Sequence, residues 1–251
     1  AMKVGVYISI ADVQGSGSNL QRIVDEAIEE AVLAEEMGFD ACFFGEHHQD
    51  RDGFLPSPLI VAAAVAARTQ RIKIGTSVLL LPLYHPVHVA EDVATLDILS
   101  KGRIILGVGI GYQPADFRAF DVPMEDRVSL FEEGIEVIRQ CWTGKPFTFH
   151  GDHFHLQDVQ VRPAAYQQPS PPLWIGASTL PGARRAGRLA DAFIAGPSTN
   201  LQRTLRLVNA YREAATRAGR QPQVVLMRDA WVASSRKESE EGYGPEVMQA
   251  Y

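Results

Sequence analysis

The sequence IKIGTSVLLLPLYHPVHVAEDVATLDILSKGRIILGVGIGY runs from Ile72 to Tyr112 and decides the fold. Its pattern predicts a strand over about residues 72–81, a helix over 86–100 and a second strand over 104–108. Pro86 suits the first helical position, and Gly102 suits the C-terminal cap. Both strands are nearly continuous runs of Val, Ile and Leu, as expected where both faces of a strand are buried. The stretch therefore predicts a strand–helix–strand unit with parallel strands.

The same rhythm of strand and helix extends along most of the chain. It predicts an α/β fold, namely a (β/α)8 TIM barrel whose last β/α unit is missing from this chain. No domain linker or exact repeat is visible, so we expect one domain over residues 1–251. Residues 145–172 interrupt the rhythm and read as a β-hairpin followed by an irregular connection. The strands are expected at residues 3–10, 40–46, 72–81, 103–110, 173–177, 191–196 and 223–233.

Composition narrows the class of protein. Of the 251 residues, 46% are hydrophobic and 22% charged, which is ordinary for a globular chain, and the net charge of -6 argues against a nucleic-acid surface. No apolar run reaches the roughly 18 residues of a membrane span, and the start reads as a strand, not as a signal peptide. Cys42 and Cys141 lie in apolar segments without C-x-x-C spacing, so we expect buried free thiols in a cytoplasmic protein.

Candidate catalytic residues follow the predicted strand that ends at Gly45. Glu46, His47 and His48 come at its carboxyl end, where α/β barrels carry their active sites. His47 is the leading candidate, because an imidazole can donate a hydrogen bond or move a proton near neutral pH. A structural histidine is the alternative. Glu46 and His48 either orient His47 or are solvated.

Glycine-rich and small residues follow two further strands. Gly107, Gly109 and Gly111 allow a ligand to approach the backbone closely, but Tyr112 stands where the dinucleotide fingerprint needs a glycine. The turn Gly176-Ala177-Ser178-Thr179 precedes a predicted helix, and it either holds a phosphate or simply caps that helix. Three histidines, His150, His153 and His155, lie on opposite sides of the predicted hairpin, so we expect no metal site.

Three segments together resemble one family: GFDACFFGEHH, the stretch from Ile72 to Tyr112, and PLWIGAST. They are similar to the luciferase-like flavin-dependent monooxygenases, a superfamily that also contains oxidoreductases with a deazaflavin coenzyme. The resemblance runs from Met2 to about Ala233. It implies a barrel enzyme that binds reduced FMN, often supplied by a separate flavin reductase, and uses oxygen to oxidise a small organic substrate. We expect a homodimer without nucleic-acid or membrane partners.

The resemblance also assigns roles to residues of this chain. It implies that His47 faces the flavin ring and that a bulge with a non-proline cis peptide at Ser77-Val78 supports the ring. Gly109, which allows close approach to the backbone, is a further candidate for binding the cofactor. The resemblance further implies that Arg127 and the turn from Gly176 to Thr179, including Ala177 and Ser178, bind the cofactor phosphate. Ile110 stands where bacterial luciferases have a second phosphate-binding arginine, so the resemblance does not extend to light emission.

Three functions remain open at this point. The preferred one is a monooxygenase that uses reduced FMN and oxygen. The second is a deazaflavin-dependent oxidoreductase that transfers hydride on the same fold. The third is a barrel that binds flavin without catalysis. The sequence does not identify the substrate.

Overall fold

The computed structural model describes residues 2–11, 20–49 and 55–242. The chain forms two compact units, Ala1–Ile175 and Gly176–Tyr251, and each is described here by itself. The expectation of a single domain stays a prediction. Residues 12–19, 50–54 and those from 243 onward lie outside the described residues.

Parallel strands form the centre of the first unit. They follow the order β1-β2-β3-β5-β8, and β4 lies beside β5. This confirms the predicted parallel arrangement; the strand predicted over 72–81 is broken into two after Thr76. The strands are β1 (Gly5–Tyr7), β2 (Ala41–Phe44), β3 (Lys73–Thr76), β4 (Leu79–Leu80), β5 (Ile104–Gly109) and β8 (Leu173–Gly176).

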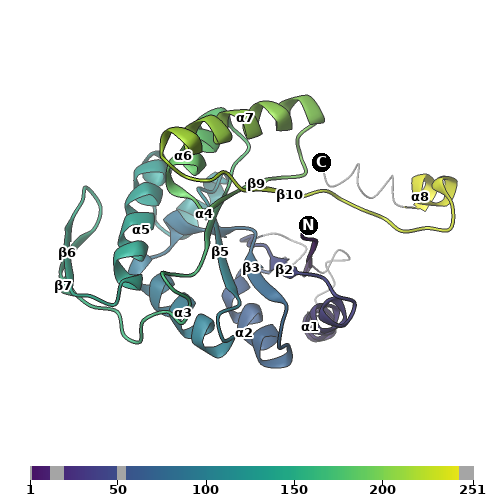
Figure 1. Cartoon of the computed structure of the whole chain (residues 1–251), viewed down its shortest axis with the longest axis horizontal. Helices are drawn as coiled ribbons and strands as arrows, with labels where there is room; N and C mark the ends of the chain where they lie inside the picture. The colour runs from purple at the N-terminus through teal and green to yellow at the C-terminus, as the bar shows by residue number, and fades with distance from the viewer. Residues whose placement is uncertain (1, 12–19, 50–54, 243–251) are drawn as a thin grey trace. The chain divides into compact units, whose positions relative to one another are not determined.

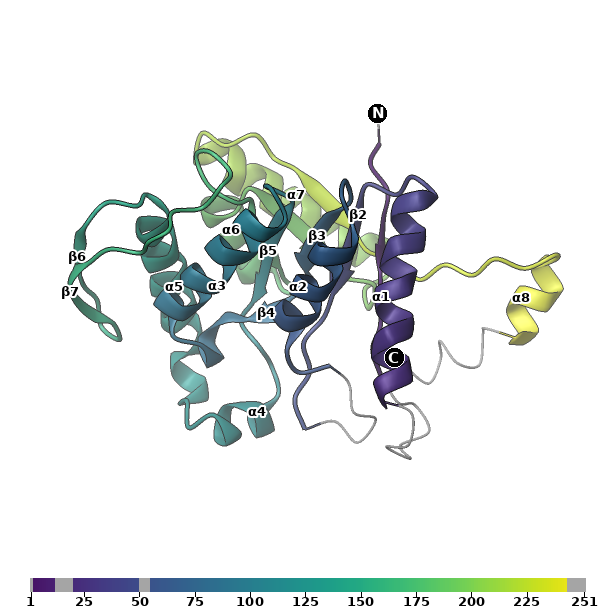
Figure 2. The same ribbon diagram turned by 90° about the horizontal axis from the view of Figure 1, so that it is seen from below.

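Helices follow these strands in the predicted order, and successive long helices pack against one another (Figure 1). The long helices are α1 (Leu20–Glu36), α2 (Pro58–Arg68), α3 (Pro86–Leu99) and α5 (Arg127–Trp142), and the short ones are η1 (Leu81–Leu83), α4 (Pro114–Ala119) and η2 (Met124–Asp126). Pro86 opens α3 as predicted, and Gly102 has a φ of 82° after its end. The loop expected after Tyr112 contains α4, which Figure 2 shows apart from the row of long helices.

Phe43 occupies space that two glycines leave open on one face of the strands. Its ring packs against Trp174, with 5.5 Å between the ring centroids. A Cβ atom on Gly75 would come within 2.6 Å of the Phe43 ring, and one on Gly5 within 3.2 Å. Phe43 and Trp174 are half-buried, whereas Phe44, on the opposite face of β2, is fully buried. The two faces of β2 therefore differ, and the Phe43 face is the more open one.

The predicted hairpin is present as β6 (Phe147–His150) and β7 (His155–Val159), which pair antiparallel. Its turn is tied to α5 by Glu133, whose carboxylate accepts the backbone N–H groups of Asp152, His153 and Phe154 at 2.8–3.2 Å. Partial burial acts to raise the pKa of Glu133, but these three N–H groups lower it below its ordinary value. The carboxylate therefore anchors the hairpin in its ionised form.

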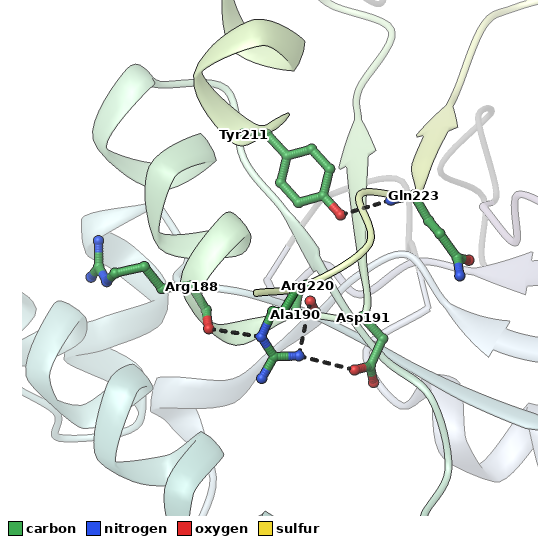
Figure 3. Close-up of polar contacts among 6 residues, drawn as sticks. All are labelled: Arg188, Ala190, Asp191, Tyr211, Arg220 and Gln223. Atoms are coloured by element: carbon green, nitrogen blue, oxygen red, sulfur yellow. Dashed lines mark hydrogen bonds and ion pairs between the residues drawn. The ribbon is translucent and has the colours of Figure 1, made fainter. Parts of the chain in front are cut away.

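The second unit contains two parallel strands and two packed helices. The elements are α6 (Leu180–Leu189), β9 (Ala192–Ala195), α7 (Leu201–Arg217), β10 (Val224–Leu226) and α8 (Arg236–Gly242). Figure 3 shows the Arg220 guanidinium beside the carbonyl oxygens of Arg188 and Ala190 and the Asp191 carboxylate, at 3.0–3.4 Å. An arginine bonded to the last carbonyls of α6 complements the negative end of that helix.

Two expectations about the chain as a whole can be compared with the structure. Cys42 and Cys141 are buried free cysteines as predicted, and burial raises the pKa of the Cys42 thiol to about 12 and that of Cys141 to about 11. Within residues 2–11, 20–49 and 55–242, no helix combines the length and the apolar character needed to cross a bilayer.

Candidate active site

Glu46 is a buried carboxylate at the carboxyl end of β2. Its side chain is 0% exposed, yet both oxygens accept hydrogen bonds. Oε2 accepts the backbone N–H of Leu80 at 2.9 Å, and Oε1 accepts the Tyr84 hydroxyl at 2.9 Å and lies 2.5 Å from Nε2 of His48. We call Glu46, His48 and Tyr84 the carboxylate cluster. It joins the end of β2 to β4 and to the segment after η1.

His48 belongs to the buried part of this site. Its side chain is 8% exposed, and its ring meets the edge of Phe120 with 4.7 Å between centroids. Gln49 donates from Nε2 to the carbonyl oxygen of Ala115 on α4 at 3.1 Å. The alternative that Glu46 and His48 are merely solvated is therefore wrong. The segment after β2 is held against α4, an element that the sequence pattern did not predict.

His47 lies between the two buried partners. Since Glu46 and His48 meet on one side of this extended segment, alternation indicates that His47 projects to the other side, the side of Phe43. His47 is half-buried, and its backbone N–H donates to the Leu55 carbonyl oxygen at 3.2 Å. Its catalytic role stays a prediction.

Two phenols border the same end of the strands. Tyr7 lies at the end of β1, and its hydroxyl occupies the space where a Cβ atom on Gly45 would point. Burial raises the pKa of Tyr7 to about 12. The pKa of Tyr84 is also raised, mainly by burial and to a smaller extent by the charge of the neighbouring Glu46. Both phenols therefore keep their protons near neutral pH and act as hydrogen-bond donors or acceptors there.

The break between β3 and β4 has the expected geometry. The peptide bond between Ser77 and Val78 is cis, which confirms that prediction. Ser77 donates its backbone N–H to the Phe44 carbonyl oxygen at 2.8 Å, and Leu80 pairs with Gly109 of β5. Both Ser77 and Val78 are half-buried, whereas Gly109 is buried. The roles of these three residues at a cofactor stay predictions.

The predicted phosphate residues lie in different units. Arg127, in the first unit, donates from Nη1 to the Met124 carbonyl oxygen at 2.7 Å. In the second unit, the Thr179 hydroxyl accepts the Gly182 N–H at 3.2 Å and caps α6, and Arg203 donates to the Ser178 carbonyl oxygen at 3.0 Å. The cap interpretation of this turn is confirmed for Thr179. Phosphate binding by Arg127 with Gly176, Ala177, Ser178 and Thr179 stays a prediction.

The hairpin histidines have local partners. His153 Nε2 lies 2.8 Å from the Ser129 hydroxyl of α5. In the described part of the chain, no group of three or more His, Cys, Asp or Glu residues is arranged to hold a metal ion.

Sequence reasoning missed Tyr7 and Tyr84 and undervalued Glu46 and His48. One signal was available for the acid: Glu46 comes two positions after the end of a wholly apolar strand, where an ionised group needs partners. Nothing in the sequence named those partners, because Tyr84 is 38 residues away.

Comparison with known proteins supplies a family. Residues 2–251 match the family model described as luciferase-like monooxygenase. An F420-dependent glucose-6-phosphate dehydrogenase of Nakamurella multipartita is 37% identical over 205 residues, which are 76% of this chain and 58% of that protein. The chain spans between 53% and 58% of the length of this relative and of two uncharacterised Sinorhizobium fredii proteins that it also matches.

Solved structures are similar over the same length. The monooxygenase RslO1 of Streptomyces bottropensis has a TM-score of 0.91 and 28% identity, covering 99% of this chain and 77% of that one. The oxygenating constituent of 3,6-diketocamphane monooxygenase of Pseudomonas putida, in complex with FMN, has a TM-score of 0.85 and 22% identity, covering 100% and 74%. These likenesses confirm the predicted fold class, an α/β fold of the TIM-barrel type.

Proposed function

The chain belongs to the luciferase-like monooxygenase family, and on that premise we propose that it is a flavin-dependent monooxygenase. In this proposal it uses reduced FMN and molecular oxygen to oxidise a small organic substrate. A separate flavin reductase supplies the reduced cofactor, and the protein acts as a homodimer. The likeness to a monooxygenase over 99% of the chain supports this choice of reaction.

The observation that carries the proposal is the arrangement at the carboxyl end of β2. The half-buried rings of Phe43 and Trp174 offer an aromatic face, and the segment that carries His47 begins three residues after Phe43. A planar cofactor needs such an apolar face together with a few placed polar groups. The residues present therefore fit a flavin-type ring.

The chain's own residues would perform three tasks in the reaction. His47 would hold or move a proton beside the cofactor ring, while Phe43 and the apolar strand ends exclude water. Arg127 would bind the cofactor phosphate, for which a guanidinium fork is well suited. The bound reduced cofactor supplies the electrons and the site at which oxygen reacts.

A second candidate is an F420-dependent oxidoreductase that transfers hydride without oxygen. The 37% identity to an F420-dependent dehydrogenase favours it. FMN and F420, a deazaflavin, share the flat tricyclic ring that the aromatic face would receive, so the site residues above serve both. The third possibility, binding of flavin without catalysis, has no specific observation in its favour.

The test supplies the protein with reduced FMN, or with F420 in its oxidised and in its reduced form, and a panel of small organic substrates. Substrate-dependent oxygen uptake with FMN supports the monooxygenase. Oxygen-independent exchange of electrons between F420 and a substrate supports the alternative and contradicts the first proposal. Binding of either cofactor without turnover of any substrate would leave the non-catalytic barrel.

A further inference from the structure

The carboxylate cluster is a largely buried polar assembly, with Glu46 at its centre, at the end of the strands where the proposed reaction takes place. Glu46 has a side chain with 0% exposure and three hydrogen-bonding partners: His48 on its own segment, and Leu80 and Tyr84 on the segment that begins at β4. A carboxylate that is taken out of water needs such partners, since an unpaired buried charge is very costly. The cluster therefore fixes these segments relative to one another.

The two carboxylate oxygens of Glu46 bind different partners. Oε2 accepts the N–H of Leu80, which pairs with Gly109 at the end of β5. Oε1 faces His48 and the Tyr84 hydroxyl. We assign a hydrogen to Nε2 of His48, since a carboxylate oxygen accepts hydrogen bonds. One side chain thus links the strand end at Leu80 to the imidazole at position 48.

His47 is the residue between the two fixed neighbours. Glu46 precedes it and is held by Leu80; His48 follows it and is held by Glu46 and by the Phe120 ring. Its own backbone N–H is bonded to Leu55. The backbone is therefore held at positions 46, 47 and 48, and the attachments of positions 46 and 48 both involve the Glu46 carboxylate.

We propose that Glu46 is a positioning residue of the candidate active site, holding His47 at a fixed place relative to the Ser77–Leu80 segment. The proposal rests on the proposed function only where it concerns turnover. Glu46 does not touch the cofactor or the substrate. It acts through its bonds to Leu80 and His48, which hold positions 46 and 48, the residues on either side of His47.

The central test is Glu46→Gln in the full chain. The amide oxygen can still accept the Leu80 N–H, but the amide nitrogen cannot accept a hydrogen from His48 Nε2. We expect the His48 ring to change tautomer and the His47 ring signals to shift, both measured by ¹⁵N NMR of the histidine side chains. Turnover should fall roughly 10–100-fold, since small displacements of a catalytic group cost about this much, while KM for the reduced cofactor changes less than about threefold.

Asp97→Asn is the matched control. Asp97 is likewise a fully buried carboxylate that accepts a backbone N–H, from Gln167 at 2.7 Å, but it lies in α3, and its hydrogen bonds join that helix to the segment before β8. The Asp97→Asn substitution should lower the melting temperature of the protein without changing the His47 NMR signals or the turnover. Tyr84→Phe removes one donor to Oε1 and should produce a smaller fall in turnover with the Nε2 hydrogen of His48 retained.

Two results would overturn the proposal. One is a Glu46→Gln protein with normal turnover although its His48 tautomer has changed. The other is an unchanged set of His47 signals in both Glu46→Gln and Tyr84→Phe. If the natural protein turns over with neither reduced FMN nor reduced F420, the proposed function fails instead, and the His47 signals alone then decide whether Glu46 positions that residue. Should Glu46→Gln fail to fold, Tyr84→Phe decides by the same two measurements.

Discussion

The first unit contains two polar groups of opposite character, each built around one buried charged side chain, Glu46 or Arg103. At the carboxyl ends of the strands, the carboxylate cluster joins titratable side chains to one another. At the amino ends, Arg103 and Glu35 bond almost entirely to backbone: Arg103 donates to four carbonyl oxygens and the Thr69 hydroxyl, and Glu35 accepts three successive N–H groups. We call Arg103 and Glu35 the amino-end pair.

The difference indicates which end of the strands is suited to the proposed chemistry. Hydrogen bonds to backbone fix loops and helix ends but leave no group free to react. Arg103 satisfies carbonyl oxygens at the ends of α2 and α3, where a cation is also favoured by the helix dipoles. In a barrel, the amino ends of the strands serve stability and the carboxyl ends serve catalysis. Changes at the two ends should therefore separate activity from stability.

The largest effect is expected for His47→Ala. If His47 handles a proton in the proposed reaction, its loss should lower turnover by ~10²–10⁴-fold while cofactor binding changes little. The measurement is steady-state turnover with reduced FMN and, separately, with reduced F420. Unfolding in urea should be almost unchanged, because His47 is only half-buried.

His48→Ala is the internal control for this prediction. It removes a side chain that braces the segment, so turnover should fall much less than in His47→Ala, although stability should fall more. A severe loss of turnover in His48→Ala with a near-normal His47→Ala protein would mean that the reacting imidazole is the other one.

The second prediction is the reverse of the one for His47→Ala: Arg103→Ala should lower the free energy of unfolding and leave turnover unchanged. The buried guanidinium makes five donor contacts, and its removal leaves carbonyl oxygens without partners, at an expected cost of about 3 kcal/mol in the free energy of unfolding. Urea unfolding measures this. Arg71→Ala removes an exposed arginine nearby and should cost less than about 0.5 kcal/mol.

The second measurement on Arg103→Ala is its turnover per folded molecule. It should equal that of the natural protein at temperatures where the variant is folded. A specific loss of turnover in the folded variant would break the separation between the two ends.

A third prediction concerns the cofactor phosphate. Arg127→Ala should weaken FMN binding by roughly 1.5–3 kcal/mol, the range for hydrogen bonds to charged groups. Titration of the flavin fluorescence gives the dissociation constant. Arg68→Ala removes the same charge next to Glu29, away from the carboxyl ends, and should leave FMN affinity unchanged. Equal affinity in both variants would remove Arg127 from the proposed site.

The smallest effect is a pH dependence at Glu35. Partial burial acts to raise the pKa of Glu35, but the N–H groups of Ile72, Arg71 and Gln70 lower it below its ordinary value of 4.5. A lowered pKa in the folded state contributes stability above about pH 4.5, and this stability is lost as the pH falls through the folded value. Glu35→Gln should cost about 1 kcal/mol at pH 7 and less below pH 4.

Urea unfolding of Glu35→Gln and of the natural protein at several pH values between 7 and 3 measures whether the difference between their free energies of unfolding shrinks as the pH falls. A constant difference from the natural protein across that range would show that the ionised form of Glu35 has no advantage.

Much of the fold could be predicted because it rests on local patterns. The apolar runs of β2, β3 and β5 and the signals at Pro86 and Gly102 are readable without tertiary contacts. Helix α4 was missed because it has only six residues, and its stability comes from Phe117 packing against Leu80 and Leu83. Such long-range packing leaves no periodic signal.

The site was predictable only in outline. The position of His47 after a buried strand predicted a site at the carboxyl end of that strand, which stays a prediction, and the family resemblance indicated the cis peptide at Ser77, which the structure confirms. The partners of Glu46 come from positions 48, 80 and 84, and only the folded chain brings these together. The environment of a buried carboxylate depends on such contacts, so its role could not be read from spacing.

The packing of Phe43 against glycines 5 and 75 has a consequence for how this sequence can vary. A side chain at position 75 would collide with the ring, so Gly75→Ala alone should be harmful, but it should become acceptable once position 43 is smaller. Related sequences should therefore vary at 43 and 75 together, trading one ring for two small side chains. Such an exchange would change the space beneath the proposed cofactor site, and with it the size of the substrate that a related protein could bind.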